Sequence, residues 1–397
     1  MELYNNIRKK VDSIAECIFA WIQDSHEQSY GLYSGEFGRL LFLLYYSNYS
    51  KNNDTVLKTE NYAEKLMSQF VEGEKLHTFC SGLSGILYSF EFLRENRMMD
   101  LDVSEVQTFL DNYIVSKMRM DTRNRFYDFM HGALGVGLYF IKRKTNPEYI
   151  WELIYFLYNS AEKDVNRNIF KWESIVDYEK RLSGYNLALS HGISSIIIFL
   201  SRVVKSGMFN DKIGEMLTGA VNYIFSQQKN FSEFGSCFPS YLLINNPETV
   251  LKSRLAWCYG DLGPGVALWQ AGKAMRQTDW KEKGLEILLL SAQRRTFDET
   301  FTNDAGICHG SAGIAMVFRR MFFETKRDEF NDATGYWINS SLSFARFEDG
   351  LAGYKTREKD GWKCDYSLLT GIAGIGLVLL SYLVKDEQDW DEFFLLS

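Results

Sequence analysis

A short glycine motif recurs seven times along the chain and constrains its fold more than any other feature. Each copy has a glycine, two further residues, a second glycine or a near equivalent, and then an apolar run. The spacing between first glycines runs from 47 residues (Gly35 to Gly82) to 68 residues (Gly192 to Gly260). The first glycines are Gly35, Gly82, Gly132, Gly192, Gly260, Gly310 and Gly371. This regular recurrence indicates a repeat architecture, with room for two helices and two loops in each unit.

Helical periodicity follows each motif. After Gly313, apolar residues recur at Ile314, Val317, Phe318 and Met321, which is the spacing of one helix face. Glycines at the start of such a helix allow close approach of neighbouring backbones. A second, more amphipathic helix is expected between motifs, whereas strand patterns are sparse. The sequence therefore predicts an all-α chain whose glycine motifs open the inner helices.

Seven helix pairs can form either an open solenoid or a closed ring. A solenoid needs polar caps at both ends, but the helix predicted after Gly371 is strongly apolar and only a short tail, residues 386–397, follows it. These features favour a seven-unit α/α toroid, a double ring of inner and outer helices. No linker or change of composition divides the chain, so one domain is predicted over residues 1–397. The longest excursions, 145–183 and 205–253, are expected to form loops and extra turns.

Composition excludes several classes of protein. A net charge of −7 argues against nonspecific nucleic-acid binding. The N-terminus has no apolar core typical of a secretory signal, and the longest apolar run, 371–384, is too short to span a bilayer comfortably. Six cysteines in a long chain without a signal are expected to be thiols or ligands. We therefore expect a cytoplasmic protein without direct membrane insertion.

Polar residues cluster in two columns of the aligned motifs. Three of the five histidines and three of the six cysteines fall one or two positions before a first glycine. Consecutive motifs supply Cys258, Cys308 and His309, two sulfurs and one imidazole that suit zinc and leave its fourth position open. The alternative is two buried cysteines and a core histidine. Cys80 and His131 share the columns and are expected to line the site, whereas Cys17, Cys237 and Cys364 are expected to be structural.

Three further residues are candidates for the chemistry. His191 is a titratable imidazole beside the proposed metal and suits general acid–base work, although a core histidine bonded to a carbonyl is the alternative. Asp128, four residues before Gly132, is placed to orient a cation or imidazolium, or simply to cap a helix. Arg254, four residues before Cys258, supplies a cation near the metal or forms a surface salt bridge. His26 and His77 are expected in loops.

Together, these motifs resemble those of a known protein family. The stretches Trp257-Cys258-Tyr259-Gly260, Cys308-His309-Gly310 and Ser190-His191-Gly192 resemble those of the lanthionine synthetase C-like proteins, the lantibiotic cyclases. The resemblance covers essentially the whole chain and all seven motifs. It implies an α/α toroid with one zinc ion held by Cys258, Cys308 and His309. It also implies catalytic roles for His191 and Asp128 and active-site positions for Arg254 and Tyr259. Ser195, in place of a second glycine, is a departure that costs only a packing glycine.

The resemblance implies a lanthipeptide cyclase. Such an enzyme adds cysteine thiols of a precursor peptide to dehydroalanine and dehydrobutyrine, which gives the thioethers lanthionine and methyllanthionine. The expected partners are the dehydrated precursor peptide, a separate dehydratase and a peptide transporter, whose complex would bring the protein to the membrane. Glutathione-type thiol addition or binding, and a non-catalytic zinc-containing scaffold that binds the precursor or the dehydratase, are the alternatives. A glycosidase is excluded because the columns lack paired carboxylates.

Overall fold

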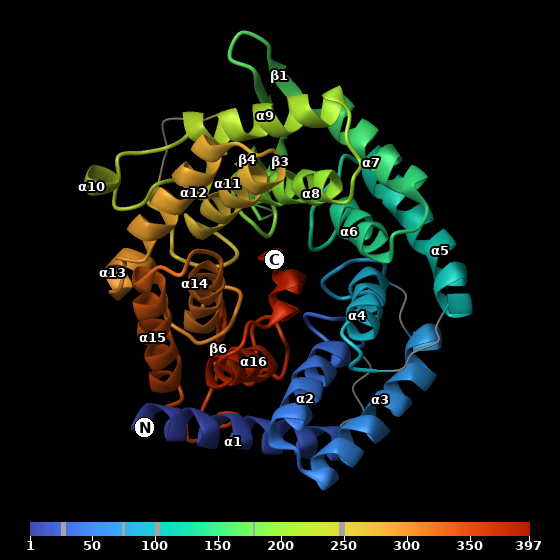
Figure 1. Cartoon of the computed structure of the whole chain (residues 1–397), viewed down its shortest axis with the longest axis vertical. Helices are drawn as coiled ribbons and strands as arrows, with labels where there is room; N and C mark the ends of the chain where they lie inside the picture. The colour runs from blue at the N-terminus through green and yellow to red at the C-terminus, as the bar shows by residue number, and fades with distance from the viewer. Residues whose placement is uncertain (25–28, 74–75, 100–103, 178, 246–250) are drawn as a thin grey trace. The chain divides into compact units, whose positions relative to one another are not determined.

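Each of the seven glycine motifs opens an α-helix, as the sequence predicts (Figure 1). The computed structural model describes all residues except 25–28, 74–75, 100–103, 178 and 246–250. In six motifs the first glycine is the N-cap residue. In the remaining one, the fifth, Asp261 takes that place, one residue after Gly260. The motif helices are α2 (Glu36–Ser50), α4 (Leu83–Glu95), α6 (Ala133–Arg143), α8 (Ile193–Lys205), α11 (Leu262–Ala274), α14 (Ser311–Thr325) and α16 (Ile372–Leu383).

The first glycine of a motif is needed because the preceding loop folds back onto it. A Cβ atom at Gly371 would lie 2.4 Å from the carbonyl oxygen of Asp365, which also accepts the N–H group of Ile372 at 2.9 Å. At Gly260 a Cβ atom would lie 1.8 Å from the carbonyl oxygen of Arg254, and the backbone there has a φ of +99°. Only glycine tolerates both the close approach and this conformation. The glycine thus fixes the path of the loop that carries the polar residues.

One compact unit consists of Met1–Val103 and Thr302–Ser397. Within it, α3 packs on α2, α15 on α14, and α1 on α16, so that the first helix of the chain pairs with the last motif helix. The remaining elements of this unit are α1 (Glu2–Asp24), α3 (Asn53–Gly73), α15 (Asp328–Ser343), the antiparallel strands β6 (Thr356–Glu358) and β7 (Gly361–Lys363), and the 3₁₀ helix η1 (Asp389–Phe394).

The C-terminal segment belongs to the core of this unit instead of forming the short tail that the sequence suggested. The ring of Phe394 stacks on that of Tyr33, with centroids 4.9 Å apart, and the Tyr33 hydroxyl donates to the carbonyl of Phe393 at 2.5 Å. Arg320 on α14 donates to both carboxylate oxygens of Asp391, each at 2.7 Å. Phe393 and Phe394 are fully buried. These contacts tie η1 to the motif helices around it.

The other unit is Ser104–Phe301. In it, α7 packs on α6, α9 on α8 and α12 on α11. Its helices besides the motif helices are α5 (Ser104–Arg123), α7 (Pro147–Ser160), α9 (Asp211–Ser226), α10 (Phe231–Phe234), α12 (Thr278–Ser291) and α13 (Phe297–Thr300). Its strands are β1 (Glu162–Asp164), β2 (Ile169–Lys171), β3 (Ser174–Asp177), β4 (Leu182–Asn186) and β5 (Tyr241–Leu243).

These strands and two regular helices occupy segments for which the sequence predicted loops and extra turns. β1 pairs with β2, and a separate antiparallel sheet has the order β3-β4-β5. Each strand has only three to five residues, which is too short to show a clear alternation of apolar and polar residues. In the chain, β3 and β4 follow the β1-β2 pair, β4 leads into the fourth motif, and β5 comes later, after α10.

Two predictions concern the chain as a whole. The prediction of a single domain over residues 1–397 remains a prediction, because contacts divide the chain into the two units above.

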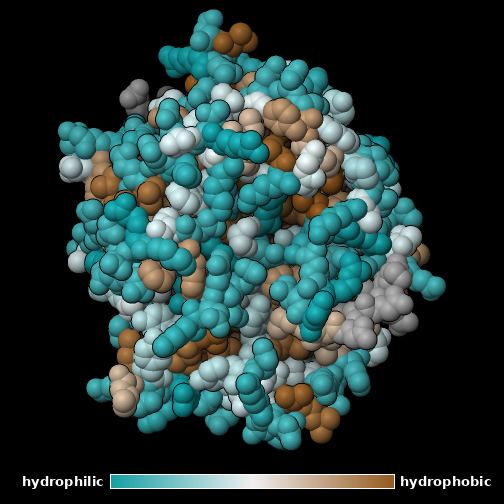
Figure 2. Space-filling view, viewed as in Figure 1, coloured by the Kyte–Doolittle hydropathy of each residue, from teal (hydrophilic) through white to brown (hydrophobic). Residues whose placement is uncertain are grey.

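Within the described residues, no helix combines the length and apolar character needed to cross a bilayer. On the face shown in Figure 2, hydrophilic residues predominate and hydrophobic residues form small separate patches.

Candidate active site

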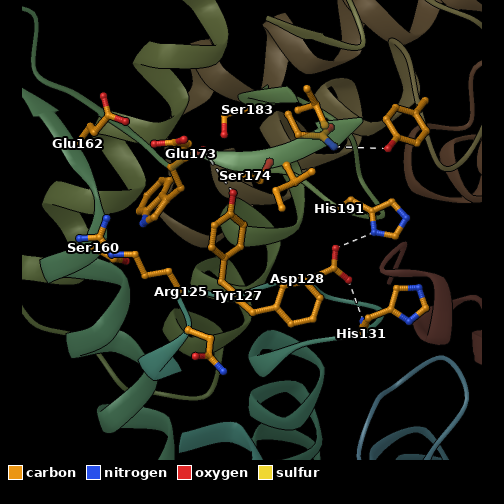
Figure 3. Close-up of a pocket in the computed structure, with 17 residues that line it drawn as sticks. Arg125, Tyr127, Asp128, His131, Ser160, Glu162, Glu173, Ser174, Ser183 and His191 are labelled. Atoms are coloured by element: carbon orange, nitrogen blue, oxygen red, sulfur yellow. Dashed lines mark hydrogen bonds and ion pairs between the residues drawn. The ribbon is translucent and has the colours of Figure 1, made fainter. Parts of the chain in front are cut away.

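The candidate site centres on an imidazole and a carboxylate from consecutive motifs. His191 precedes the N-cap glycine of α8, and Asp128 lies in the loop before α6. The Oδ2 atom of Asp128 lies 2.7 Å from Nδ1 of His191, and Oδ1 accepts the backbone N–H of His131 at 2.8 Å (Figure 3). One oxygen therefore braces the turn, while the other holds the ring of His191. Because a carboxylate only accepts hydrogen bonds, Nδ1 carries a proton and Nε2 is left to exchange one.

Burial and the carboxylate act on the pKa of His191 in opposite directions. Burial alone lowers this pKa, but the hydrogen bond and charge of Asp128, with a contribution from Cys258, raise it above the ordinary value of 6.5. His131 stacks on His191 with ring centroids 5.7 Å apart. Burial lowers the pKa of His131, and the charge of Asp128 only partly offsets this. His191 is thus the imidazole of the two that binds a proton more readily.

The pair borders a cavity of about 790 Å³ that lies wholly within the unit Ser104–Phe301. One wall is the loop 124–128 with His131, and the other is formed by residues 172–176 with Ser183 and Asn186 (Figure 3). This volume is within the range of small-molecule pockets. The His191 side chain is 29% exposed, so a ligand in the cavity can reach it.

Tyr259 joins this site, whereas Arg254 makes a contact elsewhere. Tyr259 lines the cavity with its ring centroid 6.1 Å from that of His191, and the side-chain amide of Asn186 donates to its hydroxyl at 3.5 Å. The guanidinium of Arg254 donates to the carbonyl of Phe301 at 3.2 Å and is not among the described residues that line the cavity. The catalytic roles assigned to both residues remain predictions.

The three predicted zinc ligands are divided between the two units, one in Ser104–Phe301 and two in the other. Cys258 is buried, and its carbonyl accepts the N–H groups of Leu189 and Ser190, which links its loop to that of His191. Cys308 and His309 lie in the unit that contains both termini. In the part of the chain that the structure describes, no three His, Cys, Asp or Glu side chains converge closely enough to hold a metal ion. The zinc site therefore remains a prediction.

The donor chemistry nevertheless fits zinc. Two thiols and an imidazole are a suitable set for this ion, and the Nε2 atom of His309 lies 3.0 Å from Oδ2 of Asp304. A carboxylate on the far nitrogen is the usual orienting partner of a metal-binding histidine. With Nε2 held by Asp304, His309 would offer Nδ1 to a metal ion.

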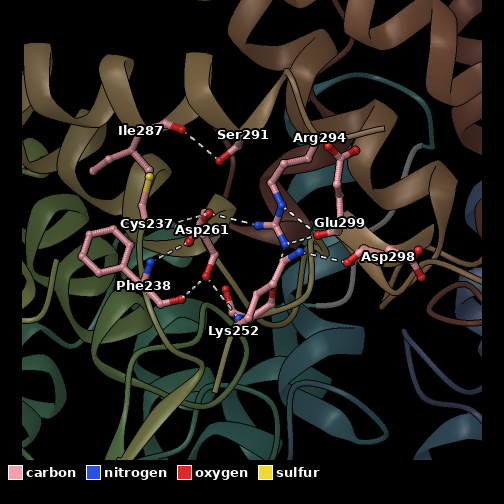
Figure 4. A network of polar contacts seen from close by, with 11 residues as sticks. Cys237, Phe238, Lys252, Asp261, Ile287, Ser291, Arg294, Asp298 and Glu299 are labelled. Carbon is pink, nitrogen blue, oxygen red and sulfur yellow. Dashed lines mark hydrogen bonds and ion pairs between the residues drawn. The ribbon is translucent and has the colours of Figure 1, made fainter. Parts of the chain in front are cut away.

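A buried ion pair supports the loop that carries Cys258 and Tyr259 (Figure 4). The carboxylate of Asp261, fully buried, accepts the N–H groups of Cys237 and Phe238 at 2.9 Å each and the Nη1 group of Arg294 at 3.0 Å. Arg294 also donates to the carbonyls of Ser253 and Glu299. These contacts fix both ends of the loop 253–261.

The other cysteines and histidines considered in the sequence differ in how far they are buried. Cys80 and Cys237 are buried, Cys17 is partly buried, and Cys364 is exposed. His77 lies in a loop, as expected, and His26 is outside the described residues.

Three features near the candidate site were not predicted from the sequence: Asn186, Asp304 and the stretch 172–176. Asn186 and Asp304 each stand six residues before a first glycine, as Arg254 does. Aligning that third column would have marked them as polar positions in the same loop. Residues 172–176, which include most of β3, lie outside every motif column, so their place beside the site had no such signal.

A family model described as lanthionine synthetase C-like protein matches residues 26–395. The chain belongs to the lanthionine synthetase C-like family. This finding confirms the resemblance seen in the motifs. Among solved structures, the chain is similar to one titled nisin cyclase, with a TM-score of 0.78, 20% sequence identity and 98% of each chain covered. At this identity the likeness shows the fold, and it confirms the all-α, α/α-toroid class predicted for this lanthionine synthetase C-like chain.

Proposed function

We propose that this chain is a lanthipeptide cyclase. It would add cysteine thiols of a dehydrated precursor peptide to dehydroalanine and dehydrobutyrine residues and form lanthionine and methyllanthionine rings. The observation that carries the proposal is the Asp128–His191 pair on the wall of a cavity, in a chain of this family. The similar solved structure, named as a cyclase, supports the same assignment.

The reaction forms one C–S bond and moves one proton. The thiol loses its proton, the sulfur attacks the β-carbon of the alkene, and the resulting enolate is protonated at its α-carbon. No oxidant or leaving group is involved. His191, held through Nδ1 by Asp128, takes the thiol proton on Nε2 and returns it to the α-carbon. A pKa raised by Asp128 suits the second transfer, in which the imidazolium is the acid.

In this proposal Cys258, Cys308 and His309 hold one zinc ion. When bound, zinc supplies a Lewis acid that lowers the pKa of a thiol bound to it. The soft donors and the bond between His309 and Asp304 support the site. Arg254 is assigned to the developing oxyanion, for which its guanidinium must turn from the carbonyl of Phe301. Tyr259 is assigned to the same end of the cavity as His191.

A thiol assay tests the function directly. Ring closure leaves the peptide mass unchanged but removes its thiol, so a synthetic peptide with one dehydroalanine and one cysteine is incubated with zinc-replete protein and then alkylated with iodoacetamide. We expect the alkylated mass to disappear much faster than in buffer. A thiol that persists at the buffer rate would refute the cyclase. Running the assay with free glutathione and a cysteine-free peptide distinguishes the glutathione alternative.

The cellular setting is also part of the proposal. We propose that a separate dehydratase supplies the substrate and that a peptide transporter removes the product. The protein itself would act in the cytoplasm and reach the membrane through that transporter complex. Co-purification of a tagged cyclase with these two proteins is the corresponding test.

A further inference from the structure

The strand β3 is an edge strand that borders the candidate active site. In the sheet order β3-β4-β5 it pairs with β4 on one side only. Residues 173–176 line the same cavity as Asp128 and His191. Among the described residues, no other segment makes a backbone hydrogen bond to residues 174–176. Within the described residues, this part of the cavity wall is therefore a strand edge whose outward backbone donors and acceptors have no partner strand.

Side-chain geometry also marks this edge. The hydroxyl oxygen of Ser174 is buried but has no hydrogen-bond partner within the described structure, although Ser174 lines the cavity. The register of β3 shifts between Ile175 and Asp177, which indicates a bulge. Bulges are common at sheet edges and beside active sites, where they redirect side chains. Protein sheets usually protect such edges, so a polar edge left open toward a cavity is typical of a binding surface.

We propose that the dehydrated peptide binds as an added strand along β3, with its reacting residue toward His191. This inference rests on the proposed cyclase function and names how the substrate is held. An extended peptide supplies the backbone groups that β3 lacks, and strand addition of this kind is a common mode of peptide recognition. Every second peptide side chain then points to the same face.

The position of β3 favours a peptide over a second copy of the chain. The edge lies within a cavity wall opposite the loop 124–128, and only four residues make up the strand. A slender extended segment fits this setting, and its pairing would be continuous with the Asp128–His191 pair that performs the chemistry. Pairing of two β3 strands between copies is the other outcome that the experiment must separate.

An N-methyl scan of the substrate tests the strand geometry. The probes are synthetic peptides of about ten residues with one dehydroalanine and one cysteine, each with a single backbone N-methyl group. Because alternate amides of a strand face its partner, we expect kcat/KM for ring closure to fall roughly three- to tenfold at every second position on one side of the dehydroalanine. A flat profile with an active unmodified peptide would overturn strand addition but leave the cyclase assignment intact.

Hydrogen exchange provides the measurement that does not need turnover. With saturating unmodified peptide, backbone amides of residues 174–177 should exchange more slowly, whereas those of β5, the other edge of the same sheet, should not change. Unchanged exchange in β3 would overturn the proposal. Protection of β3 without peptide, together with a dimer by light scattering, would overturn it in favour of a second copy. Protection by peptide without ring closure would retain the docking mode and refute the cyclase.

Discussion

The Nδ1 atom of His191 lies 2.7 Å from the Oδ2 atom of Asp128, although 63 residues separate them in the chain. Both residues stand in loops that lead into glycine-capped helices, and both belong to the same compact unit. The acid–base part of the candidate site is thus assembled from two consecutive repeats. Its chemistry follows from one carboxylate that fixes which nitrogen of the imidazole exchanges protons.

Replacing Asp128 with Asn is expected to lower the pKa of His191, because the charge and hydrogen bond that raise it are lost while burial remains. In the native protein, protonated His191 stabilises the fold because its pKa is raised on folding. This contribution is complete below about pH 6.5, the ordinary pKa of histidine, and is lost as the pH rises through the raised pKa of the folded protein. NMR titration of the imidazole measures both variants. An unchanged pKa in D128N would show that Asp128 does not tune His191.

Replacing His191 with Ala is expected to slow ring closure by about 10²- to 10⁴-fold, since proton transfer by a positioned group contributes that much. The matched control is His131→Ala, which removes the stacked imidazole of the same cavity but keeps the backbone N–H that bonds Asp128. Its rate should stay within about tenfold of the native rate. Equal losses in both variants, with native circular dichroism, would argue against the special role of His191.

The purified protein is expected to hold about one zinc ion per chain, as the three-ligand set requires. Cys308→Ala should lose it, and Asp304→Asn should weaken zinc affinity by about 10- to 100-fold because the orienting bond to His309 is lost. Cys364→Ala, which changes an exposed thiol, serves as the control and should keep its zinc. Metal analysis by mass spectrometry after dialysis provides the readout, and a zinc-free native protein would remove the metal from the proposal.

Replacing Arg294 with Met is expected to reduce the free energy of unfolding by about 3–5 kcal/mol, because it leaves the carboxylate of Asp261 buried without its cation. Arg167→Met is the control, since Arg167 forms an exposed ion pair with Asp164 that contributes at most about 1 kcal/mol. Urea unfolding followed by fluorescence gives both values. A loss below about 1 kcal/mol for R294M would mean that the ion pair does not hold the loop 253–261.

Replacing Phe393 with Ala is expected to cost about 3–5 kcal/mol, because its ring is fully buried against Phe92 and Tyr88. Phe109→Ala tests the same change at a side chain that is 72% exposed, and should alter stability by about 0.5 kcal/mol or less. Thermal unfolding compares the two. Similar small effects would show that η1 contributes little to the core.

Much of the helical framework could be predicted because its signal is chemical and local. At Gly371, any larger residue would place its Cβ atom 2.4 Å from the carbonyl oxygen of Asp365, and the loop would have to shift. A glycine under this constraint therefore marks each helix start. The residue before it is then fixed in register, which is how His191 was found. Ser195 fits where a second glycine was expected, since its hydroxyl bonds the carbonyl of Gly192.

Other features could not be predicted because they depend on contacts between distant segments. The distance between Asp128 and His191 is set by how two loops pack, and β3 has too few residues to show a strand period. The ion pair of Asp261 and Arg294 joins residues 33 positions apart, and Arg294 lies outside every motif. The burial of η1 was foreseeable in part, because Trp390, Phe393 and Phe394 have helical spacing.

The pairing of α1 with α16 has a consequence for how the protein is made. Because α1 precedes α16 by more than 300 residues, the apolar face of α1 is synthesised long before its packing partner. That face carries Ile7, Val11, Ile14 and Ile18. The unit Ser104–Phe301 is continuous and is complete in the meantime. Vectorial synthesis therefore leaves the apolar face of α1 without its packing partner until α16 has been made, and such a face is prone to aggregation in the meantime.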